Sequence, residues 1–458
     1  MRSYLVFVAV ALAAPLRAQD STLAFPVSVK TFGAKCDGVT DDARAIQAAV
    51  DAITAAGGGV LLFPRGQCVL SRTITSYKAP IVFQGMGGAG TILRWTSDVH
   101  GFTVTAAGSV IRDLTIRGPG GDVNGAGFGI NSGNATRVTV HDCIIEQWRG
   151  GGINTGGGGS LWVIARNTVR NNYQDGIYIA DGTSHSTVSG NAVEENGANG
   201  IDINGSENLI VENTVTTSGL RHTLNTADTW GILIQAVDAQ RVHADMNLII
   251  HNVVYRNPNG PGIAIRGEGA FHANFNIVEG NHSYQNGQDG ILVDGSATGA
   301  VEGTQVIGNV TNDNHRYGIA VTADKATPTR TRIANNIATG NSAGILLTSA
   351  RETTVIDNAL TGNTIAFQDD GSTQTVRAGN RLTSGSTALL TGRAKLSGGA
   401  VVVTTSEVQA NDNVLLTNVS GGGTAGFLRV SAIASGRSFT ITSSSGTDSG
   451  TIFWEIVH

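Results

Sequence analysis

Gly176-Ile-Tyr-Ile179 is one copy of a Gly-Ile-x-aliphatic unit that returns along the middle of this 458-residue chain. The other copies begin at Gly200, Gly231, Gly262, Gly290, Gly318 and Gly344, with degenerate copies at Gly129 and Gly152. From Gly152 onward the steps between copies range from 24 to 31 residues. A near-constant period predicts a solenoid, in which each repeat buries its apolar residues against its neighbours. About two dozen residues suffice for a coil of three short strands and three turns, so the longer repeats carry insertions.

The composition of the chain argues against nucleic acid and anionic membranes as binding partners. The chain has a formal net charge of -5, and only 14% of its residues are charged. Because no cluster of Lys and Arg is present in the sequence, neither nucleic acid nor an anionic membrane is expected as the main partner. The 62 glycines and 8 prolines fit tight corners between short strands rather than a disordered tail.

The first 19 residues have the pattern of an export signal. Arg2 provides the positive charge, Tyr4 to Ala14 form a short apolar run, and cleavage is expected between Ala13 and Gln19. The run is too short to span a bilayer. We therefore expect a mature protein that is secreted, periplasmic or exposed at the cell surface.

Residues 41–56 form the one convincing helix pattern of the chain. Thr40, Asp41 or Asp42 is expected to cap its N-terminus, and a run of three glycines ends it at residue 57. A solenoid of open strands needs its first coil covered, and this helix is the expected lid. Capping accounts for the two carboxylates, which would otherwise suggest a catalytic pair.

The segment that contains this helix resembles the opening of pectate-lyase-superfamily proteins. The resemblance lies in Phe32-Gly-Ala-Lys-Cys-Asp-Gly-Val-Thr-Asp-Asp42 and in Gly58-Gly-Val-Leu-Leu-Phe-Pro-Arg-Gly66, and it extends loosely to about residue 380. It implies a right-handed parallel β-helix over residues 20–385. The superfamily contains lyases, hydrolases, epimerases and tailspike-like proteins, so the resemblance does not select a reaction.

The three cysteines divide into a pair and a single residue. Cys36 and Cys68 stand where the superfamily tends to have Gly and Tyr, and both lie in the N-terminal segment. We expect them to form a disulfide in the oxidising compartment of an exported protein. Cys143 lies one repeat before Asn167 and is expected in the core.

Two further features complete the all-β architecture. Asparagine recurs once per repeat, which predicts an internal ladder of stacked side chains at one turn; its members are Asn167, Asn191, Asn213, Asn252, Asn281, Asn309, Asn336 and Asn358. Residues 386–458 contain five short alternating strands, which predict a small β-sandwich. This module could cap the far end of the solenoid, bind glycan or trimerise the chain, so the protein is expected to be a monomer or a homotrimer.

Candidate site residues follow from the alternation of side chains along each Gly-Ile strand. The first and third residues after Gly point inward, so the second and fourth point outward and are expected to be solvent-accessible. The outward columns and the insertions next to them supply the candidates, with Trp230 and Tyr178 proposed to stack on sugar rings. The catalytic candidates are Asp202, Asp228, Arg266 and Asp294, and the other candidates for substrate binding are Asn204, Gln235, Glu268 and His272.

These residues leave three functions open. In a polysaccharide lyase, Arg266 would be the base or would neutralise a uronate carboxylate, whereas in a glycoside hydrolase Asp202 and Asp228 would share the acid and base roles. A non-catalytic glycan-binding or adhesin-like β-helix is the third. The sequence lacks the Gly-His-Gly and Arg-Ile-Lys motifs of polygalacturonases and the Asp-Pro-His motif of alginate epimerases. It contains no strong metal-binding motif, although calcium remains an alternative because lyases of this fold often use it.

Overall fold

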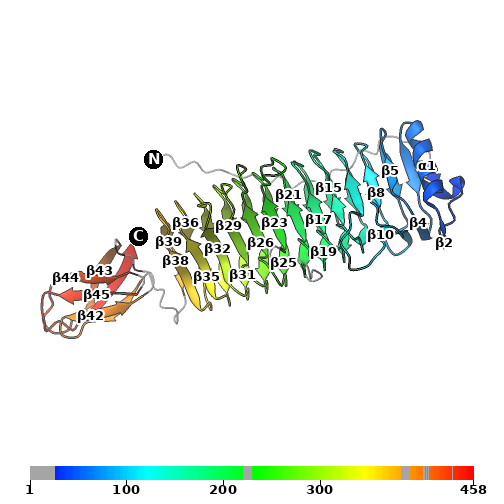
Figure 1. The fold of residues 1–458 in the computed structure, drawn as a ribbon. Coiled ribbons are helices and arrows are strands. Elements are labelled where there is room, and N and C mark those ends of the chain that lie inside the picture. The colour runs from blue at the N-terminus through cyan, green and yellow to red at the C-terminus, as the bar shows by residue number, and fades with distance from the viewer. Residues whose placement is uncertain are drawn as a thin grey trace.

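A computed structural model describes residues 26–457 except 220–228, 383–390, 406–407, 409, 411 and 436. The expected export signal, residues 1–19, lies outside the described residues. The chain forms a long stack of coils that begins at helix α1 (Ala43–Ala55) and is followed by a separate group of C-terminal strands (Figure 1). No helix in the described part of the chain is long and apolar enough to cross a membrane.

Three parallel sheets run along the stack, and each coil contributes one strand to each sheet. Sheet A runs from β1 (Val27–Ser28) to β39 (Val376–Ala378), and sheet B runs from β2 (Asp37–Asp41) to β40 (Arg381–Leu382). Sheet C contains the Gly-Ile strands: β5 (Ile74–Ser76), β8 (Phe102–Val104), β11 (Ile130–Ser132), β14 (Ile153–Asn154), β17 (Ile177–Ile179), β20 (Ile201–Ile203), β23 (Ile232–Gln235), β26 (Ile263–Arg266), β29 (Ile291–Gly295), β32 (Tyr317–Ala323), β35 (Ala343–Thr348) and β38 (Ile365–Asp370). The prediction of a parallel β-helix is confirmed.

The inward residues of these strands form one continuous core. In sheet C the first and third residues after each Gly are fully buried, as at Ile177 and Ile179 and at Ile201 and Ile203. The expected asparagine ladder lies at the corner between sheets A and B. There each amide accepts from its neighbour, as when Asn167 Nδ2 donates to Asn191 Oδ1 over 3.0 Å. These bonds satisfy backbone and side-chain groups that would otherwise be buried without partners.

The other two corners contain asparagine ladders that the sequence analysis missed. At the corner between sheets B and C the ladder includes Asn257, Asn286, Asn314 and Asn341, and at the corner between sheets C and A it includes Asn208, Asn247 and Asn276. The coils that carry these residues are therefore held to one another at their turns, which helps to fix the register of the outward side chains.

The N-terminal cap differs in detail from the expectation. Asp42 occupies the N-cap position of α1 without a side-chain cap; its carboxylate accepts instead from the backbone nitrogens of Lys35, at 2.6 Å, and Cys36, at 2.9 Å. Asp41 accepts from Ala43 N and Ser71 Oγ. Of the three expected caps, Asp41 therefore bonds to the first residue of the helix, whereas the buried carboxylate of Asp42 satisfies the turn before it.

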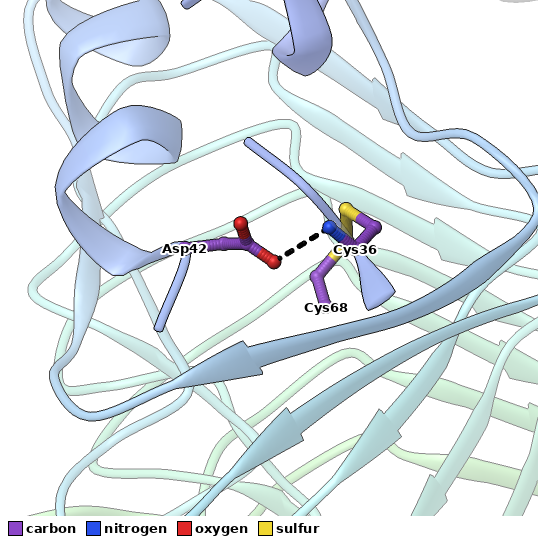
Figure 2. Close-up of side chains that lie close together, drawn as sticks. All are labelled: Cys36, Asp42 and Cys68. Carbon is purple, nitrogen blue, oxygen red and sulfur yellow. Dashed lines mark hydrogen bonds between the residues drawn. A yellow bond between two sulfur atoms is a disulfide. The ribbon is translucent and has the colours of Figure 1, made fainter. Parts of the chain in front are cut away.

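A disulfide lies beside that turn. It joins Cys36 to Cys68 of strand β4 (Gly66–Leu70), with a sulfur–sulfur distance of 1.97 Å (Figure 2). Cys143 is buried and free, and burial raises the pKa of its thiol to about 12. It is therefore a core residue rather than a nucleophile.

The C-terminal strands form two three-stranded antiparallel sheets. One contains β41 (Thr391–Lys395), β46 (Thr451–Val457) and β43 (Asn413–Ser420), and the other contains β42 (Ala400–Thr404), β45 (Ser438–Ser443) and β44 (Leu428–Ala434). Their core includes Phe439 and Trp454, whose ring centroids are 5.2 Å apart. Five of these six strands were expected; the analysis missed β41 because Thr-Gly-Arg-Ala-Lys lacks an alternating apolar pattern.

Candidate active site

The outer face of sheet C brings most of the candidate residues together. Tyr178 pairs in register with Asp202 on the next coil, and Asp202 pairs with Leu233. In the neighbouring column Gln235, Arg266 and Asp294 follow one another on strands β23, β26 and β29. Asp228 lies outside the described residues. Adjacent coils are about 4.8 Å apart, so successive members of a column are in contact range.

Several outward positions are buried, which corrects the expectation of a solvent-accessible strip. Asp202 is 8% exposed, and Asn204 and Asp294 are each 5% exposed. The reason is an outer apolar layer on the same face, formed by Trp230, Leu233, Ala264, Leu292, Ala320 and Leu346 with Tyr317 against it. Strand alternation predicts that a side chain leaves the coil, but it does not predict what packs over it.

On this face, the pKa values of two carboxyl groups are shifted far from their usual range. Asp175 immediately precedes β17, and Asp202 lies in β20 on the next coil. Burial raises the pKa of Asp175 to about 6, and burial together with the charge of Asp175 raises the pKa of Asp202 well above its usual range. The two carboxyl groups therefore titrate as an interacting pair in which burial disfavours ionisation of both.

Asn199 holds the two carboxyl groups in place. Its backbone nitrogen donates to Asp175 Oδ1 at 2.9 Å, and its Nδ2 donates to Asp202 Oδ2 at 3.1 Å. Its Oδ1 accepts from the backbone nitrogen of Trp230 at 2.9 Å. The sequence analysis missed Asp175 and Asn199, although each stands directly before a Gly-Ile unit and so occupies the same place in its coil.

Tyr178 and Asn204 extend this network. In the amide orientation that satisfies both ends, Asn204 accepts from the Tyr178 hydroxyl and donates to Asp202 Oδ1, each over 2.9 Å. Asp181 Oδ1 lies 3.3 Å from the same hydroxyl. Burial and the carboxylates of Asp202 and Asp181 raise the pKa of Tyr178. The phenol therefore keeps its proton at neutral pH and can donate a hydrogen bond.

A second charged cluster lies two to four coils further along. Arg266 Nε is 3.9 Å from Asp294 Oδ2, and the guanidinium lies 5.8 Å from the centre of the Trp230 ring. Trp230 is buried beneath this cation, so the expectation that it stacks on a sugar is not met by its position. Asp289, which precedes β29, is buried with its Oδ1 3.7 Å from Arg316 Nε, and burial raises its pKa to about 6.

The remaining candidates lie where strands β23 and β26 leave sheet C. Gln235 Nε2 donates to Glu268 Oε2 at 3.3 Å. The imidazole Nδ1 of His272 is 2.8 Å from Asp245 Oδ1, and the His272 ring stacks on His243 with centroids 3.7 Å apart. His243, Asp245 and His272 could gather around a metal ion. However, His243 Nδ1 already accepts from the backbone nitrogen of His272, so a hydrogen bond occupies one of the possible ligand atoms.

Family models match three parts of the chain. Residues 56–221 match the right handed beta helix region, residues 235–420 match the periplasmic copper-binding protein (NosD) model, and residues 388–457 match the C-terminal domain of K1 capsule-specific polysaccharide lyase. The chain is a right-handed parallel β-helix. The prediction of handedness is confirmed by these matches and by the structural comparisons below, whereas membership of the pectate lyase superfamily stays a prediction.

Curated relatives match the coils over part of their own length. Mannuronan C5-epimerase AlgE5 of Azotobacter vinelandii is 28% identical over 285 residues, which cover 58% of this chain and 25% of the relative. Alginate lyase 7 of the same organism is 30% identical over 206 residues, covering 40% and 24%. A capsule KN3-specific depolymerase of Klebsiella phage KN3-1 is 27% identical over 143 residues, covering 26% and 18%. The chain spans about a quarter of the length of the first two.

Solved structures share the fold at low sequence identity. The A-module of mannuronan C-5 epimerase AlgE6 from Azotobacter vinelandii superposes with a TM-score of 0.66 at 21% identity, covering 78% of this chain and 99% of that module. The Dettilon tailspike protein superposes with a TM-score of 0.61 at 14% identity, covering 94% of each chain. These likenesses show the fold and do not select a reaction.

Proposed function

We propose that this protein is an exported enzyme that cleaves an acidic polysaccharide by β-elimination on the outer face of sheet C. The observation that carries the proposal is that Asn199 bonds to both Asp175 and Asp202, whose pKa values are both raised, while Tyr178 lies in register beside Asp202. The names of the relatives, which include mannuronan epimerases, an alginate lyase and a capsule depolymerase, support a polysaccharide as the substrate.

The three groups match the three needs of β-elimination from a uronate. Protonated Asp202 donates to the uronate carboxylate and so favours loss of the proton on the adjacent carbon. Ionised Asp175 accepts that proton, and its pKa of about 6 suits a base that works near neutral pH. The electron pair forms a carbon–carbon double bond as the glycosidic oxygen leaves, and the Tyr178 hydroxyl protonates that oxygen.

Arg266 receives a different part from the one first expected of it. Arg266 lies against Asp294 and the Trp230 ring, so we assign it to binding a substrate carboxylate rather than to the role of base. It lies two coils from Asp202, about 9–10 Å along the helix axis, where it would bind the carboxylate of another sugar unit. Near this guanidinium, Gln235, Glu268 and His272 remain proposed substrate contacts.

Glycoside hydrolysis is the second candidate, and the same pair favours it. Two carboxyl groups with separated pKa values are the usual acid and base of a glycosidase. Asp202 would protonate the leaving oxygen, and Asp175 would act as the nucleophile or base. This pairing replaces the earlier partnership of Asp202 with Asp228, which lies outside the described residues.

Calcium belongs to the proposal as an alternative source of positive charge. Outward carboxylates on this face would supply the oxygen ligands that calcium prefers. Bound there, the ion would neutralise the substrate carboxylate. If calcium is required, EDTA should abolish turnover and added calcium should restore it; unchanged turnover in EDTA would exclude this role.

A panel of uronate and neutral polysaccharides tests these proposals. Absorbance near 235 nm reports the unsaturated product of a lyase, reducing ends without absorbance indicate a hydrolase, and retention without either indicates a binding protein. Proton NMR of the recovered polymer would reveal an epimerase, which the missing Asp-Pro-His motif argues against. We expect absorbance and reducing ends to rise together on an acidic polymer; no change on any acidic polymer would contradict the proposed function.

A further inference from the structure

The outward column that contains Asp202 is polar on the N-terminal side of that residue and aliphatic on its C-terminal side. On the N-terminal side Asn131, Asn154 and Tyr178 lead to Asp202 in unbroken register on strands β11, β14, β17 and β20. On the C-terminal side the column continues with buried aliphatic residues; they are Leu233, Ala264, Leu292, Ala320 and Leu346. Within this column, polar groups therefore continue from Asp202 toward the N-terminal coils only, whereas the proposed contacts Gln235 and Arg266 on the C-terminal side lie in the neighbouring column.

The two asparagines present hydrogen-bond donors without partners. Asn131 is partly exposed, and its side chain makes no hydrogen bond within the described part of the chain. Asn154 Oδ1 accepts from the backbone nitrogen of Gly156 at 2.8 Å, which orients the amide while Nδ2 makes no bond to any described residue. Amide nitrogens donate to carboxylate or hydroxyl oxygens, and an acidic sugar carries both.

One side of these coils is bounded by the loop before β11. Gln174 Nε2, next to Asp175, donates to Asn124 Oδ1 at 2.9 Å and so ties this loop to coil β17. Close by, the Phe128 ring packs against Gly151, where an added Cβ would lie 2.6 Å from the ring.

We propose that Asn131 and Asn154 bind the sugar units on the N-terminal side of the reactive pair, so that the polysaccharide continues from Arg266 past Asp202 toward the N-terminal coils. This proposal rests on the proposed function and adds the direction of the bound chain. At about 4.8 Å per coil, Asn154 lies about 10 Å from Asp202 and Asn131 about 14 Å. Longer oligosaccharides would reach both amides, and short ones would reach neither.

Isothermal titration calorimetry with mannuronate and galacturonate oligomers, from dimer to hexamer, tests the proposal. The measurements use the Asp202→Asn variant, so that the enzyme does not cleave the ligand. Asn131→Asp and Asn154→Asp retain the side-chain shape and the Asn154 acceptor for Gly156 while removing the donor and adding negative charge. We expect each change to weaken hexamer binding at least tenfold, and Asn→Ala to weaken it about fivefold. Dimer binding should not change.

Gln368→Ala is the matched control, because Gln368 lies in the same column at the far end of sheet C, on strand β38. It should leave hexamer affinity unchanged. Hexamer binding that survives both asparagine changes, or that Gln368→Ala weakens equally, would overturn the direction of binding and leave the proposed function standing. A wild-type protein that binds no acidic polymer of the panel would remove the proposed function and this inference together.

Discussion

Asp175 and Asp202 show how residues on adjacent coils of the β-helix change each other's pKa values. Each carboxyl group is partly or fully removed from water, and the charge of Asp175 on the preceding coil further raises the pKa of Asp202. Asp202 was predictable as an outward residue of a Gly-Ile strand. Its buried state was not, because strand alternation does not reveal which side chains pack over an outward residue.

Asp175→Asn should stabilise the protein in a pH-dependent way. The folded pKa of Asp175 is raised from 3.8 to about 6, so its contribution to stability is fully present below pH 4 and is lost as pH rises through 6. The variant keeps the Oδ1 acceptor for Asn199. Its melting temperature should match the wild type near pH 4 and exceed it at pH 7; an excess that is the same at both values would contradict the raised pKa.

Asp202→Asn and Tyr178→Phe should each reduce kcat at least a hundredfold on the polymer that proves to be the substrate, because each removes a proton that the reaction uses. Activity of the wild type should rise with pH through about 6 as Asp175 ionises. Arg330→Ala is the control, because Arg330 forms exposed ion pairs with Glu302 and Glu352 away from sheet C. Near-normal rates in both site variants would place the reaction elsewhere.

At the scale of elements, the period and the Gly-Ile pattern were sufficient to predict the coils and their register. One asparagine ladder was recognised because its members follow β-branched or apolar residues. The ladder that includes Asn286 and Asn314 was missed, because its residues lie in turns where no strand pattern draws attention to them. Helix α1 was expected at 41–56 and occupies 43–55, because Asp41 and Asp42 bond to the segments around it.

Asn252→Ala should destabilise the coils by roughly 3 kcal/mol or more. It removes the acceptor for Asn213 Nδ2 and the donor to Ile210 O, and it leaves buried polar groups unpaired. Thermal unfolding followed by circular dichroism measures the effect. Asn418→Ala, at an exposed position of β43, is the control and should change the melting temperature little. If Asn252→Ala and Asn418→Ala both lower the melting temperature by the same small amount, the ladder contributes little to stability.

At the scale of the whole molecule, the disulfide joins the segment before the helix to the first coils. Titration of the denatured, unreduced protein should find one free thiol, Cys143, and titration after reduction should find three. Two or three thiols before reduction would count against the bond. Because the closed loop spans 32 positions, reduction should cost about 3–4 kcal/mol and expose the N-terminal coils to protease first.

The ladders at all three corners also bear on how such a molecule can change its length. In the coils where asparagine ladders are present at the corners, neighbouring coils are joined by the same kinds of bond, so gain or loss of one such coil would leave similar joints on either side. The near-repeat His243-Ala-Asp and His272-Ala-Asn on successive coils has the form that duplication of one coil would leave behind. Body length can then evolve in increments of one strand spacing while the carboxyl pair stays untouched.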